Sequence, residues 1–216
     1  MTPDLPRLLL IADGFAGGRT RPSGGRQEAD AVRRVAARLV AAGVRWVSLR
    51  DHHADDAAFG RAAARLAERI RDIHPDTRLA VHGRAETARR LRTDLHVGRR
   101  GATLADALAV APAVGVSAHS ADEVIRAAEA GAAYATLSPV FRTATHPEAT
   151  PLGLDALAAA VAAAPPGFPV LALGGVSPDR ARDCRAAGAH GVAVLSGLLD
   201  AHRADAVAAR YLDATA

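Results

Sequence analysis

Three histidines end or lie within short apolar segments, and histidine is the side chain best suited to carry a proton near neutral pH. His119 lies in GVSAHSADE, directly after an apolar segment, and His82 ends the segment LAVH. His96 lies inside DLHV, where its side chain could point to either side of a strand. Each of them could instead be a packing or capping residue. The three could also form a metal site, but no HxH or HExxH spacing supports one, so we expect no metal.

Two glycine-containing segments in the last quarter of the chain are typical of a phosphate site. LALGGVSPDR carries Gly174 and Gly175, and GVAVLSG carries Leu195 and Ser196. Glycine lets the backbone approach an anion closely, and backbone N–H groups at a helix start can then bind it. The glycines could instead only form tight turns. We predict that these four residues bind the phosphate of a small phosphorylated substrate.

Arg50 follows the apolar segment WVSL, and its guanidinium could hold a carboxylate or a phosphate. Its neighbour Asp51 could instead pair with it and make it structural. Residues 137–154, LSPVFRTATHPEATPLGL, form a long connection for this chain. Such loops often clamp or cover a substrate, although an inert surface loop is the alternative. Together with Arg50 and His82, we predict that substrate is contacted by Ser138, Thr143 and Thr145, with His146 at the same loop tip.

The scaffold that gathers these residues follows from the alternation of short apolar runs with longer helical segments, which is typical of βα units and a parallel sheet. Eight strands are predicted, at Leu8 to Ala12, Val44 to Leu49, Leu79 to His82, Asp94 to Val97, Ala113 to Val116, Ala133 to Leu137, Pro169 to Leu173 and Gly191 to Leu195. Eight helices are predicted at 27–42, 55–72, 85–92, 102–110, 120–130, 153–164, 177–187 and 197–213.

This pattern predicts a single (βα)8 barrel domain over residues 1–216, in the α/β class. An open doubly wound sheet is the alternative, but no GxGxxG follows the first strand. Helix boundaries agree with the scheme: Ser120 and Glu123 form a capping-box pattern, and Ser177 precedes Pro178 at a helix start. Gly43, Gly131 and Gly188 each follow a helical segment, where a left-handed cap is expected. In such a barrel, the carboxyl ends of the strands form the active site.

Composition excludes several kinds of function. The 216 residues include 54 Ala and no Lys, so all 27 basic side chains are Arg and lysine chemistry is excluded. The formal net charge is only +4, arginine is dispersed and aromatics make up 3%, so we expect no nucleic-acid partner. The single Cys184, in a helical context, is expected to be a packed residue of a reduced, cytoplasmic protein. No apolar run is long enough to span a membrane and no signal-peptide pattern begins the chain.

Taken in order, several segments resemble the family of thiamine phosphate synthase and the TenI-like thiazole tautomerase, which are small (βα)8 barrels of the thiamine pathway. The most specific segments are SLRDHHADD, GVSAHSADEVIRAAEAGAAYATLSPVFRTATH with PLGL, and LALGGVSPDRARDCRAAGAHGVAVLSG. The resemblance covers nearly the whole chain. It implies a phosphorylated thiazole ligand, and the alanine-rich outer helices are compatible with a monomer or a homodimer.

The residues that depart from the synthase pattern favour the tautomerase branch. Where synthases carry a Gln, a Lys and an Asn-Asp pair that holds Mg²⁺, this chain has Ser48, His52 and His82-Gly83. The fourth loop offers Arg99 instead of a second acidic ligand, and His146 replaces a lysine. The tautomerase branch, whose third strand ends in Asn-Gly-Arg, is closer.

The resemblance therefore implies that His119 shuttles a proton, that the glycine loops hold the phosphate and that no cofactor is needed. Two alternatives are a divergent synthase that couples hydroxymethylpyrimidine diphosphate to thiazole phosphate with Mg²⁺, and a non-catalytic binder or regulator.

Overall fold

The computed structural model describes residues 5–17, 25–99, 101–143, 147–195, 197 and 204–216. Within them, eight parallel strands form a closed barrel in chain order, and β8 pairs with β1. The strands are β1 (Leu8–Asp13), β2 (Trp46–Arg50), β3 (Arg78–His82), β4 (Asp94–Val97), β5 (Val114–Ala118), β6 (Tyr134–Leu137), β7 (Val170–Leu173) and β8 (Gly191–Val194). The closed barrel confirms the predicted fold and excludes the open sheet.

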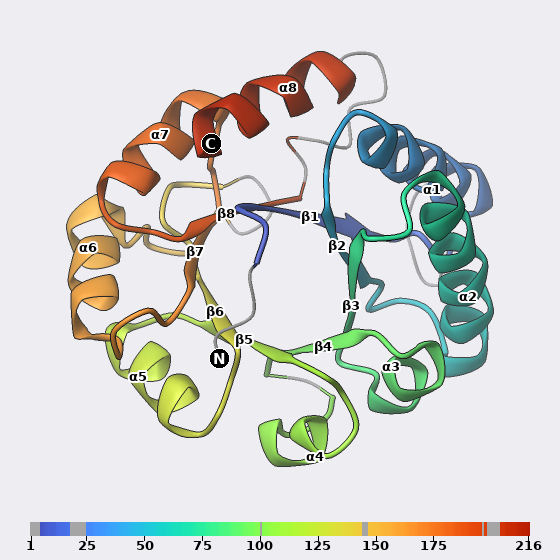
Figure 1. The fold of residues 1–216 in the computed structure, drawn as a ribbon, viewed down its shortest axis with the longest axis horizontal. Coiled ribbons are helices and arrows are strands. Elements are labelled where there is room, and N and C mark those ends of the chain that lie inside the picture. Colours follow the sequence, from blue (N-terminus) through green and yellow to red (C-terminus); the bar gives the residue numbers. More distant parts are fainter. Residues whose placement is uncertain (1–4, 18–24, 100, 144–146, 196, 198–203) are drawn as a thin grey trace.

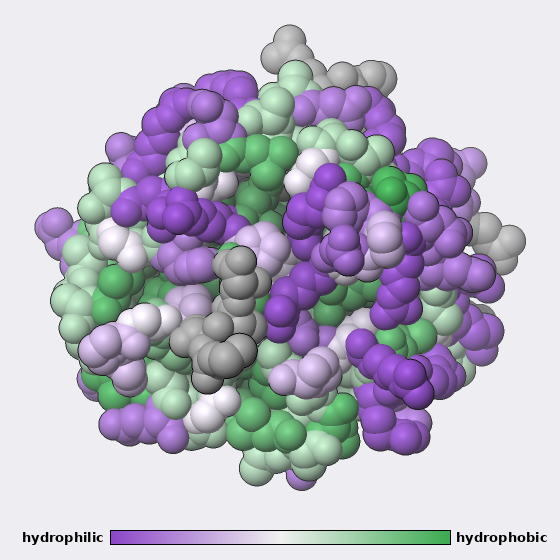
Figure 2. Space-filling view, in the orientation of Figure 1, coloured by the Kyte–Doolittle hydropathy of each residue, from purple (hydrophilic) through white to green (hydrophobic). Residues whose placement is uncertain are grey.

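A helix follows each strand in the chain, and the helices surround the barrel (Figure 1). They are α1 (Gly25–Ala41), α2 (Asp56–Ile73), α3 (Ala85–Leu91), α4 (Leu104–Leu108), α5 (Ala121–Glu129), α6 (Gly153–Ala163), α7 (Pro178–Ala186) and α8 (Ala204–Thr215). Part of the segment predicted as the last helix, residues 198–203, lies outside the described residues. Hydrophilic side chains gather on the side of α1 and α2 (Figure 2), in keeping with the dispersed arginines of these helices.

Strand side chains alternate between two hydrophobic clusters, as the two-residue period of a strand requires. Leu8 and Leu10 of β1 belong to the larger cluster, which includes residues from the surrounding helices. Leu9 and Ile11 belong to a smaller cluster with Trp46 and other strand residues. The smaller cluster therefore fills the barrel interior, below the polar residues at the carboxyl ends of the strands.

The glycines after three helices have the predicted left-handed conformation, with φ of +113° at Gly43, +91° at Gly131 and +91° at Gly188. In each case the N–H of the next residue bonds back into the helix, as Val44 N does to Leu39 O at 3.0 Å. This is the hydrogen bond of a Schellman cap. Because the cap uses Val44, β2 begins later than the sequence pattern predicts.

Two predicted helix starts are confirmed by their caps. The Ser177 hydroxyl accepts a hydrogen bond from Arg180 N, with Pro178 at the first helical position. The Ser120 hydroxyl accepts from Glu123 N at 3.2 Å. The reciprocal bond differs from a capping box, because the Glu123 carboxylate accepts from His119 N rather than from Ser120 N. In the described part of the chain, no helix is long and apolar enough to cross a membrane.

Candidate functional site

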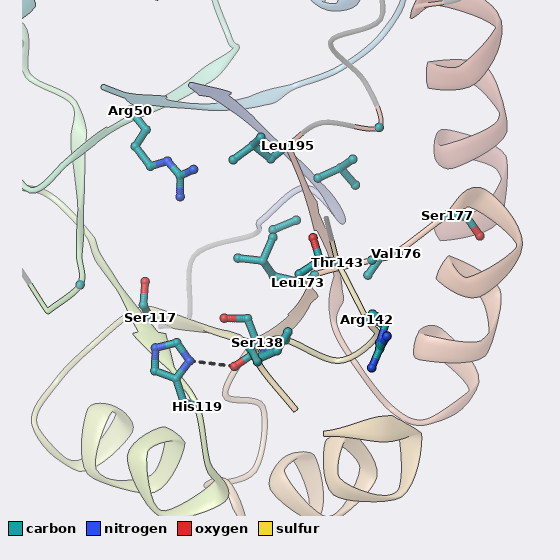
Figure 3. A pocket seen from close by; sticks show the side chains of 18 of the residues that line it. Arg50, Ser117, His119, Ser138, Arg142, Thr143, Leu173, Val176, Ser177 and Leu195 are labelled. Carbon is teal, nitrogen blue, oxygen red and sulfur yellow. Dashed lines mark hydrogen bonds between the residues drawn. The ribbon is translucent and has the colours of Figure 1, made fainter. Parts of the chain in front are cut away.

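A pocket of about 970 Å³ lies at the carboxyl ends of the strands and contains most of the predicted site residues. Of those predicted residues, the pocket is lined by Arg50, His82, His119, Ser138, Thr143, Gly174, Gly175 and Leu195. Thr145, His146 and Ser196 lie outside the described residues. Arg50 and His119 reach the pocket from one side, whereas Arg142 and Ser177 lie on the opposite side (Figure 3).

Arg50 is held by a carboxylate of the neighbouring strand. Its Nε and one terminal nitrogen donate to the two carboxylate oxygens of Asp13, at 3.1 and 3.2 Å. The two residues are register partners on β1 and β2, so the pair follows from strand pairing. The alternative that Asp51 pairs with Arg50 is wrong. Asp51 instead accepts bonds from Ala16 N, His53 N and Ala54 N, and thereby orders two loops.

His119 lies at the pocket mouth, just after β5, and its ring orientation is fixed by the backbone. Nδ1 of His119 lies 2.8 Å from the carbonyl oxygen of Ser138 (Figure 3). A carbonyl only accepts hydrogen bonds, so Nδ1 must carry the proton and donate. In the neutral ring, Nε2 is then an unprotonated acceptor. The sequence placed His119 at this mouth but gave no information about its tautomer.

Three imidazoles lie in a row beside the pocket, near the ends of β2, β3 and β4, and two of them, His52 and His82, line it. The His82 ring contacts the His52 ring at a centroid distance of 5.4 Å and the His96 ring at 5.0 Å. Burial, with smaller contributions from neighbouring positive groups, lowers the pKa of His82 to about 2. Burial also lowers the pKa of His96 to about 4, with a smaller contribution from Arg50. Both rings are therefore neutral at physiological pH.

His96 points into the barrel and connects its interior to the pocket. Nδ1 lies 3.1 Å from the Tyr134 hydroxyl, and Nε2 lies 2.9 Å from the hydroxyl of Ser117, which lines the pocket. Burial raises the pKa of Tyr134 above that of an ordinary phenol. The Tyr134 ring occupies the space above Gly115, where a Cβ would lie 2.0 Å from the ring.

The glycine loop after β7 packs directly against the loop after β6. Phe141 N donates to Gly174 O at 3.0 Å. A Cβ at Gly175 would lie 2.3 Å from Arg142 O, and the φ of Gly175 is +64°. Arg180 joins the same loops, because it donates to Gly175 O at 2.7 Å and its guanidinium lies 4.6 Å from the Phe141 ring centroid. The two loops therefore form one backbone platform beside the start of α7.

Several pocket residues were given no site role from the sequence. Arg99 and Arg142 add positive charge to the lining, and Ser117 adds a hydroxyl. Tyr211 of α8 also lines the pocket and donates to Val176 O at 2.7 Å. Ser117 and Arg99 follow strands, as His119 does, and this position marked them as candidates without a specific role. Tyr211 carried no such signal, because it reaches the site from a helix.

The residues present fit a metal site poorly. Glu148 is the only carboxylate among the described residues that line the pocket. No group of three or more His, Cys, Asp or Glu side chains in the described ranges is placed to hold a metal ion. The ends of β3 and β4 offer His82 and Arg99. Magnesium prefers oxygen ligands, usually carboxylates, so the donor set at these strand ends does not suit it.

Comparisons with known proteins agree with one another. The family model described as thiamine monophosphate synthase matches residues 23–198. A thiamine-phosphate synthase of Chloroflexus aurantiacus is 32% identical over 96% of this chain and 91% of that protein. One of Methanoregula boonei is 34% identical over 89% of this chain and 85% of that protein. The solved thiamine phosphate pyrophosphorylase of Pyrococcus furiosus has a TM-score of 0.77 at 22% identity, and the match covers 97% of this chain and 95% of that one, which supports the fold.

Proposed function

The chain belongs to the thiamine monophosphate synthase family of thiamine-biosynthesis enzymes, and from that premise we propose that it aromatises a thiazole phosphate carboxylate by proton transfer. The observation that carries this proposal is the hydrogen bond from His119 Nδ1 to Ser138 O, which leaves Nε2 as the acceptor. A neutral imidazole with one fixed donor nitrogen and one free acceptor nitrogen is suited to general base catalysis.

In the proposed reaction, His119 Nε2 removes the proton from the ring carbon that bears the carboxylate. The electron pair of that C–H bond becomes part of the aromatic ring, and the exocyclic double bond takes up a proton from the imidazolium. No atom is gained or lost, so the reaction is an isomerisation. Aromaticity of the product provides the driving force, and general acid–base catalysis contributes about 10² to 10⁴ fold.

The other predicted site residues bind and orient the substrate in this proposal. The backbone N–H groups of Gly174 and Gly175, beside the start of α7, bind the phosphate together with Leu195 and Ser196. Arg50, held by Asp13, pairs with the carboxylate. His82 contributes a neutral hydrogen-bonding ring, and Ser138 and Thr143 contact the substrate. Thr145, which lies outside the described residues, is proposed as a further substrate contact.

Thiamine phosphate synthase itself is the second candidate, and the names of the relatives favour it over an isomerase. Synthases of this family use Mg²⁺, whereas the wall formed by His52, His82 and Arg99 offers no carboxylate for that ion. The proposal of an isomerase therefore depends on the site residues, and the synthase candidate depends on family membership.

One experiment with two arms separates these candidates. Purified protein is incubated with the non-aromatic thiazole phosphate carboxylate, and product is followed by its absorbance and by mass spectrometry. We expect turnover that falls at least 100-fold in His119→Ala, within the range for loss of a general base. His190→Gln is the control, since His190 precedes β8 at the opposite end of the barrel, where it bonds Leu5 O.

The second arm supplies hydroxymethylpyrimidine diphosphate, the aromatic thiazole phosphate and Mg²⁺, and measures pyrophosphate. Magnesium-dependent pyrophosphate release without isomerisation would replace the isomerase by the synthase. Equal isomerisation rates in the wild type and His119→Ala would remove His119 from the mechanism. Ligand-induced thermal stabilisation without turnover in either arm would identify a non-catalytic binder.

A further inference from the structure

Tyr211 of α8 connects the outer layer of helices to the backbone of the loop after β7. Its hydroxyl donates to Val176 O at 2.7 Å, and the residue is 1% exposed. Val176 comes directly after Gly174 and Gly175, and these three residues line the pocket together with Tyr211. A single hydrogen bond between residues 35 positions apart therefore joins α8 to the loop that is predicted to bind phosphate.

The loop after β7 carries a run of backbone donors without acceptors. In the described part of the chain, the N–H groups of Gly175, Val176 and Ser177 donate to no protein group. Ser177 is also the N-cap of α7, so these donors lie at the positive end of a helix dipole. Free N–H groups in this position are suited to bind an anion.

The Tyr211 hydroxyl fixes the orientation of one of these donors. Val176 O and Ser177 N belong to the same planar trans peptide group, in which the C=O and N–H bonds point in opposite directions. Because Tyr211 holds Val176 O by its hydroxyl, the N–H of Ser177 must point away from that hydroxyl. Without the hydroxyl, this peptide group would lose the bond that prevents it from rotating.

Tyr211 has no second proton to offer to a phosphate. A phenol has one proton, and here it is donated to Val176 O. Burial raises the pKa of Tyr211 to about 12, so the hydroxyl keeps this proton at physiological pH. Phosphate oxygens act mainly as acceptors at that pH, and the hydroxyl would have nothing to donate to them. Tyr211 can therefore act on a bound phosphate only through the loop.

The loop after β8 lies against the same hydroxyl. A Cβ at Gly197 would lie 2.9 Å from the Tyr211 hydroxyl oxygen, and Gly197 also lines the pocket. Beyond this hydroxyl, α8 is held beside α7 (Figure 1) by ion pairs such as Arg210 with Asp179 at 3.2 Å. Both side chains of that pair are exposed, so the pair contributes little to the position of α8. The buried hydroxyl is the specific link between α8 and the two predicted phosphate loops.

We propose that Tyr211 is a positioning residue of the phosphate site, and that its hydroxyl orients the peptide between Val176 and Ser177 so that the free N–H groups of the loop bind phosphate oxygens. The inference rests on the proposed function in taking the glycine loops as the phosphate site. Through this tyrosine, α8 takes part in substrate binding although the tyrosine itself donates nothing to the substrate.

Phosphate affinity is the first test, with Tyr211→Phe as the variant and Thr215→Val as the matched control. Thr215 is buried on the same helix, and its hydroxyl donates to Tyr211 O at 2.8 Å, so each variant loses one buried hydroxyl of α8. Calorimetry measures Kd for inorganic phosphate and for the aromatic thiazole phosphate. We expect both Kd values to rise about tenfold in Tyr211→Phe and to be unchanged in Thr215→Val.

Three results of this test would overturn the proposal. They are an unchanged Kd in Tyr211→Phe, an equal rise of Kd in Thr215→Val, and a wild-type protein that binds neither probe. Amide NMR of the ligand-free proteins adds a measurement that does not depend on binding. The Ser177 amide resonance should move in Tyr211→Phe and stay in place in Thr215→Val, and an unmoved resonance in Tyr211→Phe would also contradict the proposal.

Gly197→Ala tests the link from the opposite side. The added Cβ would overlap the Tyr211 hydroxyl oxygen, so Kd for phosphate should rise when Tyr211 is present. In Tyr211→Phe that oxygen is absent, and Gly197→Ala should then add little to the loss, because both changes act through the same hydroxyl. Additive losses in the double variant would show that the two residues act independently.

Failure of this inference and failure of the proposed function give different results. Phosphate binding needs no turnover, so weaker binding in Tyr211→Phe without isomerisation by the wild type would refute the proposed function only. If the wild type isomerises, Tyr211→Phe should raise KM about tenfold with kcat nearly unchanged, since the phosphate is bound equally in the ground state and the transition state. Isomerisation by Tyr211→Phe with the wild-type KM would refute the role of Tyr211 only.

Discussion

Replacing Gly175 by alanine should disrupt the platform formed by the loops after β6 and β7. Gly175 has a φ of +64°, and an added Cβ would lie 2.3 Å from Arg142 O and 2.9 Å from Phe141 Cβ. The left-handed conformation alone costs an alanine about 1 to 2 kcal/mol. Relieving the overlap requires the backbone to move, which adds about 1 to 3 kcal/mol. We therefore expect Gly175→Ala to lower the free energy of unfolding by about 2 to 5 kcal/mol.

Gly167→Ala is the matched control, because Gly167 has a φ of +79° and no atom lies within 4 Å of an added Cβ. In Gly167→Ala, the free energy of unfolding should fall only by the cost of the left-handed conformation, about 1 to 2 kcal/mol. Both substitutions reduce the entropy of the unfolded chain in the same way, so that contribution cancels in the comparison. Urea denaturation measures the two free energies, and calorimetry measures the affinity for inorganic phosphate.

Phosphate affinity should fall at least tenfold in Gly175→Ala, since the displaced backbone no longer presents its N–H groups, and should be unchanged in Gly167→Ala. Equal destabilisation of the two variants would show that the contact between the loops is loose. Undiminished phosphate affinity in a destabilised Gly175→Ala would show that the anion binds elsewhere.

Three further predictions concern the barrel mouth and core. Asp13→Asn should raise the KM for the carboxylate substrate about fivefold (about 1 kcal/mol) because it frees Arg50; an unchanged KM in steady-state kinetics would show that Arg50 needs no anchor. The lowered pKa values of His82 and His96, about 2 and about 4, mean that below an unfolded-state pKa of about 6.5 the unfolded chain binds more protons than the folded one. The free energy of unfolding should therefore fall as the pH falls, by up to about 1.4 kcal/mol per pH unit for each ring, until about pH 4 for His96 and about pH 2 for His82. Urea denaturation between pH 7.5 and 5 should show a smaller loss of stability in His82→Asn than in the wild type. An equal dependence on pH in the two proteins would contradict the lowered pKa of His82. Burial raises the pKa of the Cys184 thiol to about 11, so a thiol reagent at pH 8 should label it only after unfolding, and labelling of the folded protein would contradict its packed position.

The fold could be predicted from local signals because each βα unit carries its own. The apolar runs, the serine caps and the glycines after helices act within a few residues of one another, so the element order and the closed barrel follow from the sequence. The predicted first residues of strands were less accurate. The apolar pattern places the start of β2 at Val44, but Val44 N forms the Schellman hydrogen bond of the preceding helix, and β2 begins at Trp46.

The site could be predicted as a set of positions but not as a set of contacts. Position after a strand placed Arg50 and His119 in the pocket. The partner of Arg50 depended on the register between β1 and β2, which brings Asp13 opposite it. The orientation of His96 depended on strand parity and on Tyr134, a residue 38 positions away in sequence. Such pairings arise only when the barrel closes.

The space above Gly115 links the evolution of two positions in this protein. A side chain at residue 115 would overlap the ring of Tyr134, whose carbon lies 2.0 Å from the position of an added Cβ. A mutation at either position alone should destabilise the protein. A larger residue at 115 would overlap the Tyr134 ring, and a smaller residue at 134 would leave a cavity. Substitution in relatives should therefore occur as correlated pairs, with a compact residue at 134 accompanying any gain of volume at 115. A lineage that made this exchange would also lose the phenol that lies 3.1 Å from His96 Nδ1, and with it a partner that helps to hold this buried ring.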